Sequence, residues 1–140
     1  MAIVKFPGKL RRFSRRIPVV WSIINLRAAR LESARATSSA FAESIVGYEN
    51  DLAHTKSLLK RASPGEKLLL ERDLHSTKQL IANLKIARLK VLLGSSRLRK
   101  EFNLTKHGIR REIKALEEKV AEECDLISAI EKRAKLKPVE

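Results

Sequence analysis

Several residue types with distinctive chemistry are scarce in this chain of 140 amino acids. Cysteine, tryptophan and tyrosine occur once each, and histidine occurs three times. The single Cys124 cannot form an intramolecular disulfide, and the scattered histidines lack paired cysteines or a His-Glu-x-x-His motif. We therefore expect no disulfide framework, no metal site and no cofactor. Aromatic residues make up only 4% of the chain, which argues against RNA recognition by base stacking on aromatic side chains.

Catalytic motifs and long apolar runs are also missing. The five glycines are isolated, so neither a P-loop nor a dinucleotide fingerprint is present, and no nucleophile, base and orienting group share a credible spacing. The longest apolar stretch, from Ile17 to Leu26, is half the roughly 20 residues that cross a bilayer. We expect a protein that is not an enzyme, has no small-molecule substrate and lacks a membrane span. The lone cysteine fits an intracellular or organellar compartment.

Positive charge is abundant and unevenly distributed. Thirty Lys and Arg against sixteen Asp and Glu give a net charge of +14. Residues 1–31 hold eight basic and no acidic residues, and residues 76–111 hold ten basic and one acidic; the segments 32–75 and 112–140 are nearly balanced. Such an excess produces self-repulsion in a compact chain, which an anionic partner would relieve.

The apolar pattern predicts an all-α fold. Apolar residues recur with a seven-residue period that starts at Ile24, and a companion row runs beside them, which indicates a coiled-coil-like seam. The first row continues through Leu31, Ser38, Ile45, Leu52 and Leu59, and the companion row is Ala34, Phe41, Tyr48, Thr55 and Ala62. Pro18 is suited to the first turn of this helix. A helix from Pro18 to Ala62 would be about 67 Å long, so we expect an elongated molecule.

The remaining segments complete a helical hairpin and a third helix. Ser63, Pro64 and Glu66 predict an N-cap, a first helical residue and a capping box. The second helix should fold back antiparallel, with one row at Leu70, Leu74, Thr77, Ile81, Leu84, Arg88 and Val91. A last apolar row at Ile113, Leu116, Val120, Ile127 and Ile130 is interrupted by Glu123. We expect a basic arm (1–17), a hairpin (18–93), a basic connector (94–108) that is weakly ordered from Phe102 to Gly108, and a C-terminal helix (109–137).

The first basic block is a candidate anion-binding arm. We assign nucleic-acid contacts there to Lys9, Arg11, Arg12, Arg15 and Arg16. The same Arg-rich, acid-free composition is typical of a mitochondrial transit peptide, and its amphipathic spacing would also suit an anionic membrane surface. A solvated tail is the plainest alternative. Trp21, in the apolar run that follows, is either a core residue or an anchor for a protein partner.

The second basic block is the candidate phosphate-tracking surface. Its assigned contacts are Arg97, Arg99, Lys100, Lys106, Arg110 and Arg111, with a solvated helix face as the alternative. Arg88 falls on the apolar row, where it could contact a protein partner, pair with an acid or extend to water. The remaining polar residues have simpler interpretations. We expect His54, His75 and His107 to be exposed and Cys124 to be a small core residue. The acidic residues should form a solvated face or contact a basic protein partner: Glu117, Glu118, Glu122 and Glu123.

These features favour a structural component of a large ribonucleoprotein. The hypothesis is a subunit of an organellar, mitochondrial ribosome that contacts rRNA phosphates through the two basic blocks, beside neighbouring proteins. One alternative is a peripheral helical subunit of a mitochondrial membrane complex, with the arm on anionic lipid. Another is a self-associating coiled-coil adaptor, because the apolar rows of three helices exceed what one hairpin buries.

Overall fold

All regular secondary structure in the described part of the chain is helical. The computed structural model describes residues 18–136, and the side chains of residues 22–135. Its helices are α2 (Pro18–Leu59), α3 (Pro64–Leu93), α4 (Ser96–Glu101) and α5 (Lys106–Leu136). The predicted all-α class is therefore confirmed. The arm at residues 1–17 lies outside the described residues.

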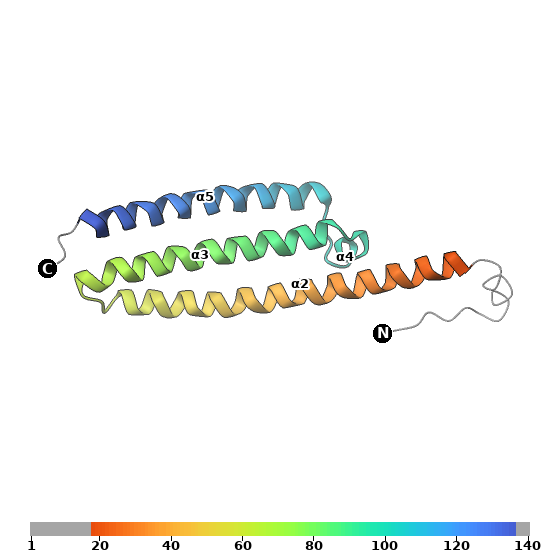
Figure 1. Ribbon diagram of the computed structural model, residues 1–140, viewed down its shortest axis with the longest axis horizontal. Coiled ribbons are helices and arrows are strands. Elements are labelled where there is room, and N and C mark those ends of the chain that lie inside the picture. The colour runs from red at the N-terminus through yellow and green to blue at the C-terminus, as the bar shows by residue number, and fades with distance from the viewer. Residues whose placement is uncertain (1–17, 137–140) are drawn as a thin grey trace.

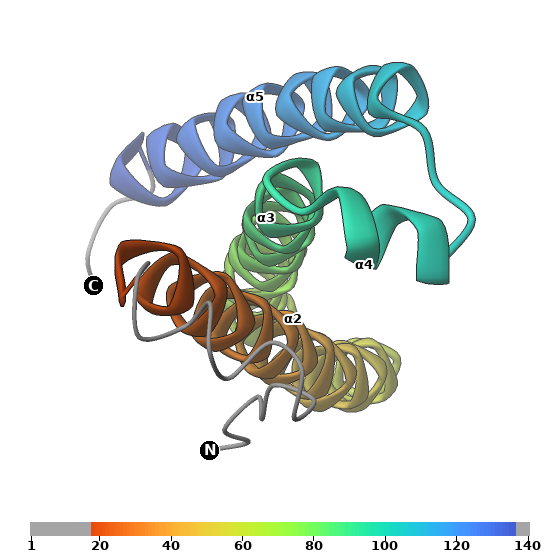
Figure 2. The same ribbon diagram turned by 90° about the vertical axis from the view of Figure 1, so that its right-hand side faces the viewer.

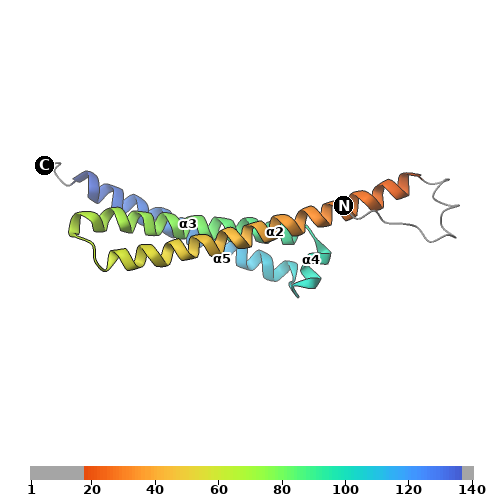
Figure 3. The same cartoon turned by 90° about the horizontal axis from the view of Figure 1, so that it is seen from below.

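The three long helices lie alongside one another, with α3 between α2 and α5 (Figure 1). The view from the end also places α3 between its two neighbours and shows α4 beside the end of α3 (Figure 2). Helix α3 runs opposite to both α2 and α5, and α2 continues past α4 at its N-terminal end (Figure 3). Because α3 contacts both neighbours, it must bury apolar residues on two faces.

Helix α2 follows the apolar pattern of its sequence. It begins at Pro18, which lacks the N–H that would be unpaired in a first turn. Ser38 and Ile45 are buried, and the other members of the seven-residue row are half-buried. In the companion row, Tyr48 is 37% exposed and the remaining residues are half-buried. The face predicted to be apolar is thus the covered face, while coiled-coil packing and an elongated shape in solution stay predictions.

Helix α3 buries more of its surface than one apolar row can supply. The predicted row is half-buried except for Ile81, which is buried. The other buried residues of the helix are Ala82, Ile86, Leu89 and Leu92, which form a second row. The single-row prediction was incomplete because a central helix faces two neighbours.

The turn between α2 and α3 confirms two of three local predictions. Ser63 occupies the N-cap position of α3 and Pro64 its first helical position. The predicted capping box is wrong, since the Ser63 side chain makes no capping hydrogen bond. Ser63 and Glu66 are exposed, so water can satisfy the free N–H groups of this helix end.

The predicted basic connector contains a short helix, α4. Ser95 caps α4 by accepting a hydrogen bond from the Leu98 N–H at 3.3 Å, and Leu98 is fully buried. Asn103 then adopts a left-handed conformation with φ of 55°, which Asn tolerates better than most residues. Thr105 caps α5, accepting a hydrogen bond from the Gly108 N–H at 3.0 Å, so the last helix begins at Lys106 rather than Ile109. The prediction of weak order is therefore wrong for Lys106 to Gly108, which form the first turn of α5.

Candidate nucleic-acid interface

The best-buried part of the protein lies where α4 joins α3 to α5. Leu92, Leu98 and Ile109 come from three different helices and are 1%, 0% and 1% exposed. They belong to one hydrophobic cluster, against which Leu31 and Ala34 of α2 also pack. We call this region, residues 86–114, the α4 end. Its apolar core fixes the positions of the surrounding basic segments relative to one another.

The surface of the α4 end is rich in cations. Seven of its basic residues are exposed: Lys90, Arg97, Lys100, Lys106, Arg110, Arg111 and Lys114. Its only carboxylates are Glu101 and Glu112. The predicted contacts Arg97, Lys100, Lys106, Arg110 and Arg111 are therefore brought to one end of the three-helix arrangement and left open to solvent. None of these seven is among the ion pairs found in the described residues.

An arginine of α2 neutralises one of the two carboxylates of the α4 end. Arg35 donates two hydrogen bonds to Glu101, at 2.7 and 2.8 Å, in a bidentate pair. These hydrogen bonds from Arg35, with its positive charge, lower the pKa of the Glu101 carboxyl. The pair joins α4 to α2. It also leaves the neighbouring lysines and arginines with little opposing charge.

Two helices of the α4 end place cations where helix stability alone would favour acids. Neither α4 nor α5 has an acidic residue in its first turn, and α5 starts with Lys106. A helix N-terminus carries partial positive charge, so each nearby cation typically destabilises it by about 0.3–1 kcal/mol. An external anion such as a phosphate would relieve both the cations and the helix ends.

Arg99 differs from the other predicted contacts, because its side chain is half-buried and engaged within the protein. Its guanidinium donates hydrogen bonds to the backbone oxygen of Leu92, at 3.2 Å, and to that of Leu93. These carbonyls belong to the last turn of α3, where the regular helical hydrogen bonds end, and that of Leu92 also accepts from the Ser95 N–H at 3.2 Å. The geometry gives Arg99 a helix-capping role that spacing alone did not indicate, and its phosphate contact stays a prediction.

Arg88 also makes contacts within the chain. Its Nε donates to Ser38 Oγ at 3.3 Å, and its guanidinium carbon lies 5.7 Å from the centre of the Phe102 ring. Arg88 thus satisfies the buried hydroxyl of Ser38 and stacks near an aromatic face. Within the described residues it has no acidic partner. Its predicted contact with a protein partner stays a prediction.

The first basic block cannot be placed in this interface. The predicted contacts at Lys9, Arg11, Arg12, Arg15 and Arg16 lie outside the described residues. Trp21 lies in α2, and its side chain is likewise outside the description. Further along the same helix, Ile23 and Leu26 are 45% and 51% exposed. This part of α2 therefore presents apolar side chains to solvent.

A polar contact missed by the sequence analysis joins α3 to α5. His75 Nδ1 lies 2.5 Å from Glu123 Oε2, with the two side chains 19% and 9% exposed. The predictions of a solvated Glu123 and an exposed His75 are wrong, because each provides the other's partner inside the interface. Cys124, expected in the core, is exposed instead, since the adjacent Glu123 takes the inward position.

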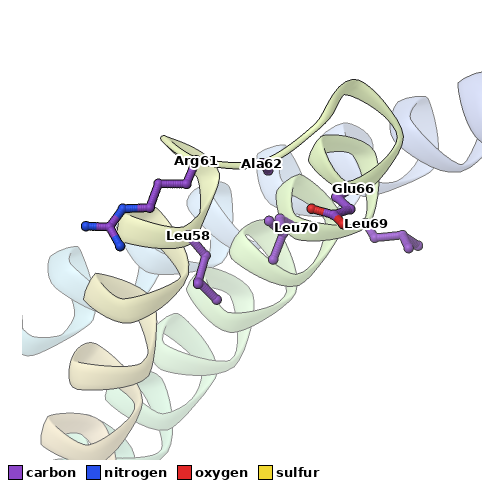
Figure 4. A pocket seen from close by; sticks show the side chains of 6 residues that line it. All are labelled: Leu58, Arg61, Ala62, Glu66, Leu69 and Leu70. Carbon is purple, nitrogen blue, oxygen red and sulfur yellow. The ribbon is translucent and has the colours of Figure 1, made fainter.

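The far end of the molecule holds an apolar pocket of about 340 Å³ (Figure 4). Leu58 of α2 and Leu70 of α3 lie between the two helices there, with Ala62, Glu66, Leu69 and Arg61 around them. Within residues 22–135, no three His, Cys, Asp or Glu side chains gather closely enough to hold a metal ion. None of the described helices is long and apolar enough to cross a membrane.

Comparisons with known proteins do not assign the chain to a family. No protein-family model, curated protein or solved structure matches it.

Proposed function

We propose that this chain is a non-catalytic structural component of a large ribonucleoprotein and that its α4 end contacts RNA phosphates. The observation that carries the proposal is the set of seven exposed cations over a common buried core, with one of two local carboxylates paired to Arg35. Lysine and arginine gain affinity for RNA by releasing condensed counterions, without reading base identity. A rigid cationic surface also loses little conformational entropy on binding.

The wider setting of the proposal is an organellar, mitochondrial ribosome. Its support is the composition of residues 1–31, which hold eight basic and no acidic residues as transit peptides do, beside a second block that suits rRNA. A coiled-coil-like hairpin of elongated shape would place the α4 end against RNA and leave the rest of the helices for neighbouring proteins. In such an assembly, the arm at residues 1–17 would supply a second set of phosphate contacts.

Salt-dependent binding to an RNA hairpin tests the proposal. The α4-end variant combines Arg97→Gln, Lys100→Gln and Arg110→Gln, which leaves the structural Arg99 in place. The distal variant combines Lys60→Gln, Lys67→Gln and Lys132→Gln, three exposed positions outside the α4 end. Both variants lose three positive charges, and glutamine keeps a helix propensity close to that of the replaced residues.

The expected result is a difference between these two variants. Log Kd plotted against log salt should become shallower by roughly one for each lost phosphate contact in the α4-end variant. The distal variant should keep a slope close to that of the unmodified chain. Equal changes in both variants would show that only net charge matters and would remove the α4 end as the interface.

A second function is favoured by the exposed apolar residues of α2. Ile23 and Leu26, followed by Arg27 and Arg30, would suit a peripheral subunit that rests on an anionic membrane. Flotation with cardiolipin-containing vesicles at low salt tests this alternative. Binding that is lost in Ile23→Asn/Leu26→Asn, but kept in the α4-end variant, would support it; failure of the unmodified chain to float would exclude it.

A further inference from the structure

A second group of lysines lies away from the α4 end, in a groove between α2 and α5. Helix α3 forms the floor of the groove, because it lies between the other two helices (Figures 1 and 2). Lys56 comes from α2, Lys78 and Lys85 come from α3, and Lys119 comes from α5. We call this site the lysine groove. Its volume is about 310 Å³, near the lower end of small-molecule sites, which run from roughly 300 to 1,000 Å³.

Opposing charge in the lysine groove is sparse. Glu49 is the only carboxylate among its lining residues, and its Oε1 lies 3.8 Å from Lys85 Nζ. Among the described residues, no carboxylate oxygen lies within 4.0 Å of the ammonium groups of Lys56, Lys78 or Lys119. Four ammonium groups minus one carboxylate leave three positive charges around one cavity.

Most lysines of the groove also lack a carboxylate at helical spacing in the sequence that could neutralise their charge. A carboxylate three or four residues away on the same helix would stabilise an exposed lysine. Lys56, Lys78 and Lys85 have no Asp or Glu at those spacings, and Lys78 and Lys85 are half-buried above the buried Ile81 and Ala82. Lys119 does have Glu122 and Glu123 one turn away, but Glu123 is paired with His75. A solvated lysine face would not require this convergence from three helices.

We propose that the lysine groove binds a compact anion that carries two or more adjacent phosphate groups. Ammonium groups are compact, strongly hydrated point charges that suit phosphate oxygens, and the groove contains no arginine. A terminal phosphate group carries about −1.5 to −2 charge and a phosphodiester about −1, so at least two adjacent phosphates are needed to match the three positive charges. Free polyphosphates and nucleoside triphosphates have this chemistry, and consecutive phosphates of an RNA strand share it. A cavity of about 310 Å³ lined by three helices favours the compact form.

Calorimetric titration of the full chain with tripolyphosphate tests this assignment. The groove variant combines Lys56→Gln, Lys78→Gln and Lys119→Gln and keeps the Lys85–Glu49 pair. We expect saturable binding of one tripolyphosphate per chain, weakened about tenfold or more in the groove variant. The distal variant, which loses the same net charge, should bind within about threefold of the unmodified chain. Equal losses in the two variants, or no saturable site, would overturn the proposal.

A variant that is expected to bind tripolyphosphate more tightly provides a test that misfolding cannot mimic, because misfolding would only weaken binding. Glu49→Gln removes the only carboxylate of the groove and should tighten tripolyphosphate binding by a few-fold. Glu43→Gln, on the same helix but outside the groove, supplies the control for net charge and should change binding less. Equal or weaker binding by Glu49→Gln relative to this control would contradict an anion site at the groove.

A parallel titration with the RNA hairpin distinguishes this inference from the proposed function. The α4-end variant should lose affinity for the RNA hairpin and keep its affinity for tripolyphosphate. The groove variant should do the reverse, because the two groups of cations occupy different parts of the molecule. A groove variant that loses RNA binding while binding tripolyphosphate normally would assign the groove to RNA and refute the compact-anion proposal.

Discussion

The two ends of α3 differ in how completely the side chains around them are buried. At the α4 end, three residues from three helices are no more than 1% exposed. Toward the α2–α3 turn, no residue between positions 46 and 80 is buried, and Leu58 and Leu69 are 42% and 63% exposed. The exposed cations of the proposed interface therefore stand on the well-packed end. A charged surface on a tightly packed core keeps its geometry. Fixed geometry suits contacts with RNA phosphates, which depend on the positions of the phosphates and not on the base sequence.

The largest expected effect comes from breaking the core of the α4 end. Leu98→Ala should lower the free energy of unfolding by about 2–5 kcal/mol, because Leu98 is fully buried and its loss leaves a cavity. Leu69→Ala, near the turn, should change it by less than about 0.5 kcal/mol. Urea denaturation measures both values. Similar losses for the two variants would contradict the contrast between the ends.

The next effect concerns the polar contact that joins α3 to α5. His75→Ala should destabilise the protein by about 1–3 kcal/mol, since it removes the partner of the Glu123 carboxyl in a nearly buried position. Glu122→Ala, on the exposed side of the same helix turn, is the matched control and should have little effect. Urea denaturation of both variants measures the two changes in the free energy of unfolding. If Glu122→Ala is as damaging as His75→Ala, the His75–Glu123 contact is not a stabilising one.

A smaller effect distinguishes two arginines of the α4 end. Arg99→Gln should reduce stability by about 0.5–1.5 kcal/mol, because the hydrogen bonds to the Leu92 and Leu93 carbonyls are lost. Arg97→Gln should leave stability unchanged within about 0.5 kcal/mol and should weaken RNA binding instead. Thermal unfolding, followed by an RNA titration of each folded variant, separates the two roles. The reverse pattern would show that the capping geometry of Arg99 is unimportant.

The smallest effect is a loss of the α2–α4 contact in acid. The folded state lowers the pKa of Glu101 below its ordinary value of 4.5, so the unfolded state binds more protons near that pH. The stabilisation is therefore present above pH 4.5 and is lost as the pH falls through the folded pKa. Amide NMR shifts of α4 should report this change in the unmodified chain and not in Glu101→Gln. An unchanged α4 spectrum between pH 6 and pH 3 would contradict it.

Local signals in the sequence were sufficient to locate the first residues of two of the long helices. Pro18 and Pro64 begin α2 and α3 as predicted, because proline fits a first helical turn. The apolar row of α5 is also covered as predicted, with Ile113 and Ile130 buried. Helix α4 was missed because it is only six residues long, too short to show an apolar period.

Contacts between distant residues could not be predicted from spacing. His75 and Glu123 are 48 positions apart, and Arg35 and Glu101 are 66 apart, so their pairing depends on how the helices are arranged. The same holds for the lysine groove: Lys78 and Lys85 belong to the second basic block, but their approach to Lys56 and Lys119 depends on how the helices are arranged. Five of the seven exposed cations of the α4 end were predicted as contacts, whereas Lys90 and Lys114 were not. The capping role of Arg99 required its position beside the end of α3.

The central claim is that RNA contacts the α4 end, and NMR mapping tests it most directly. An RNA hairpin titrated into ¹⁵N-labelled chain should shift the amides of residues 90–114, with Arg97, Lys100 and Arg110 among the most affected. Residues 46–80, toward the turn, should change little. The largest shifts in residues 46–80, or uniform small shifts along all helices, would contradict the claim.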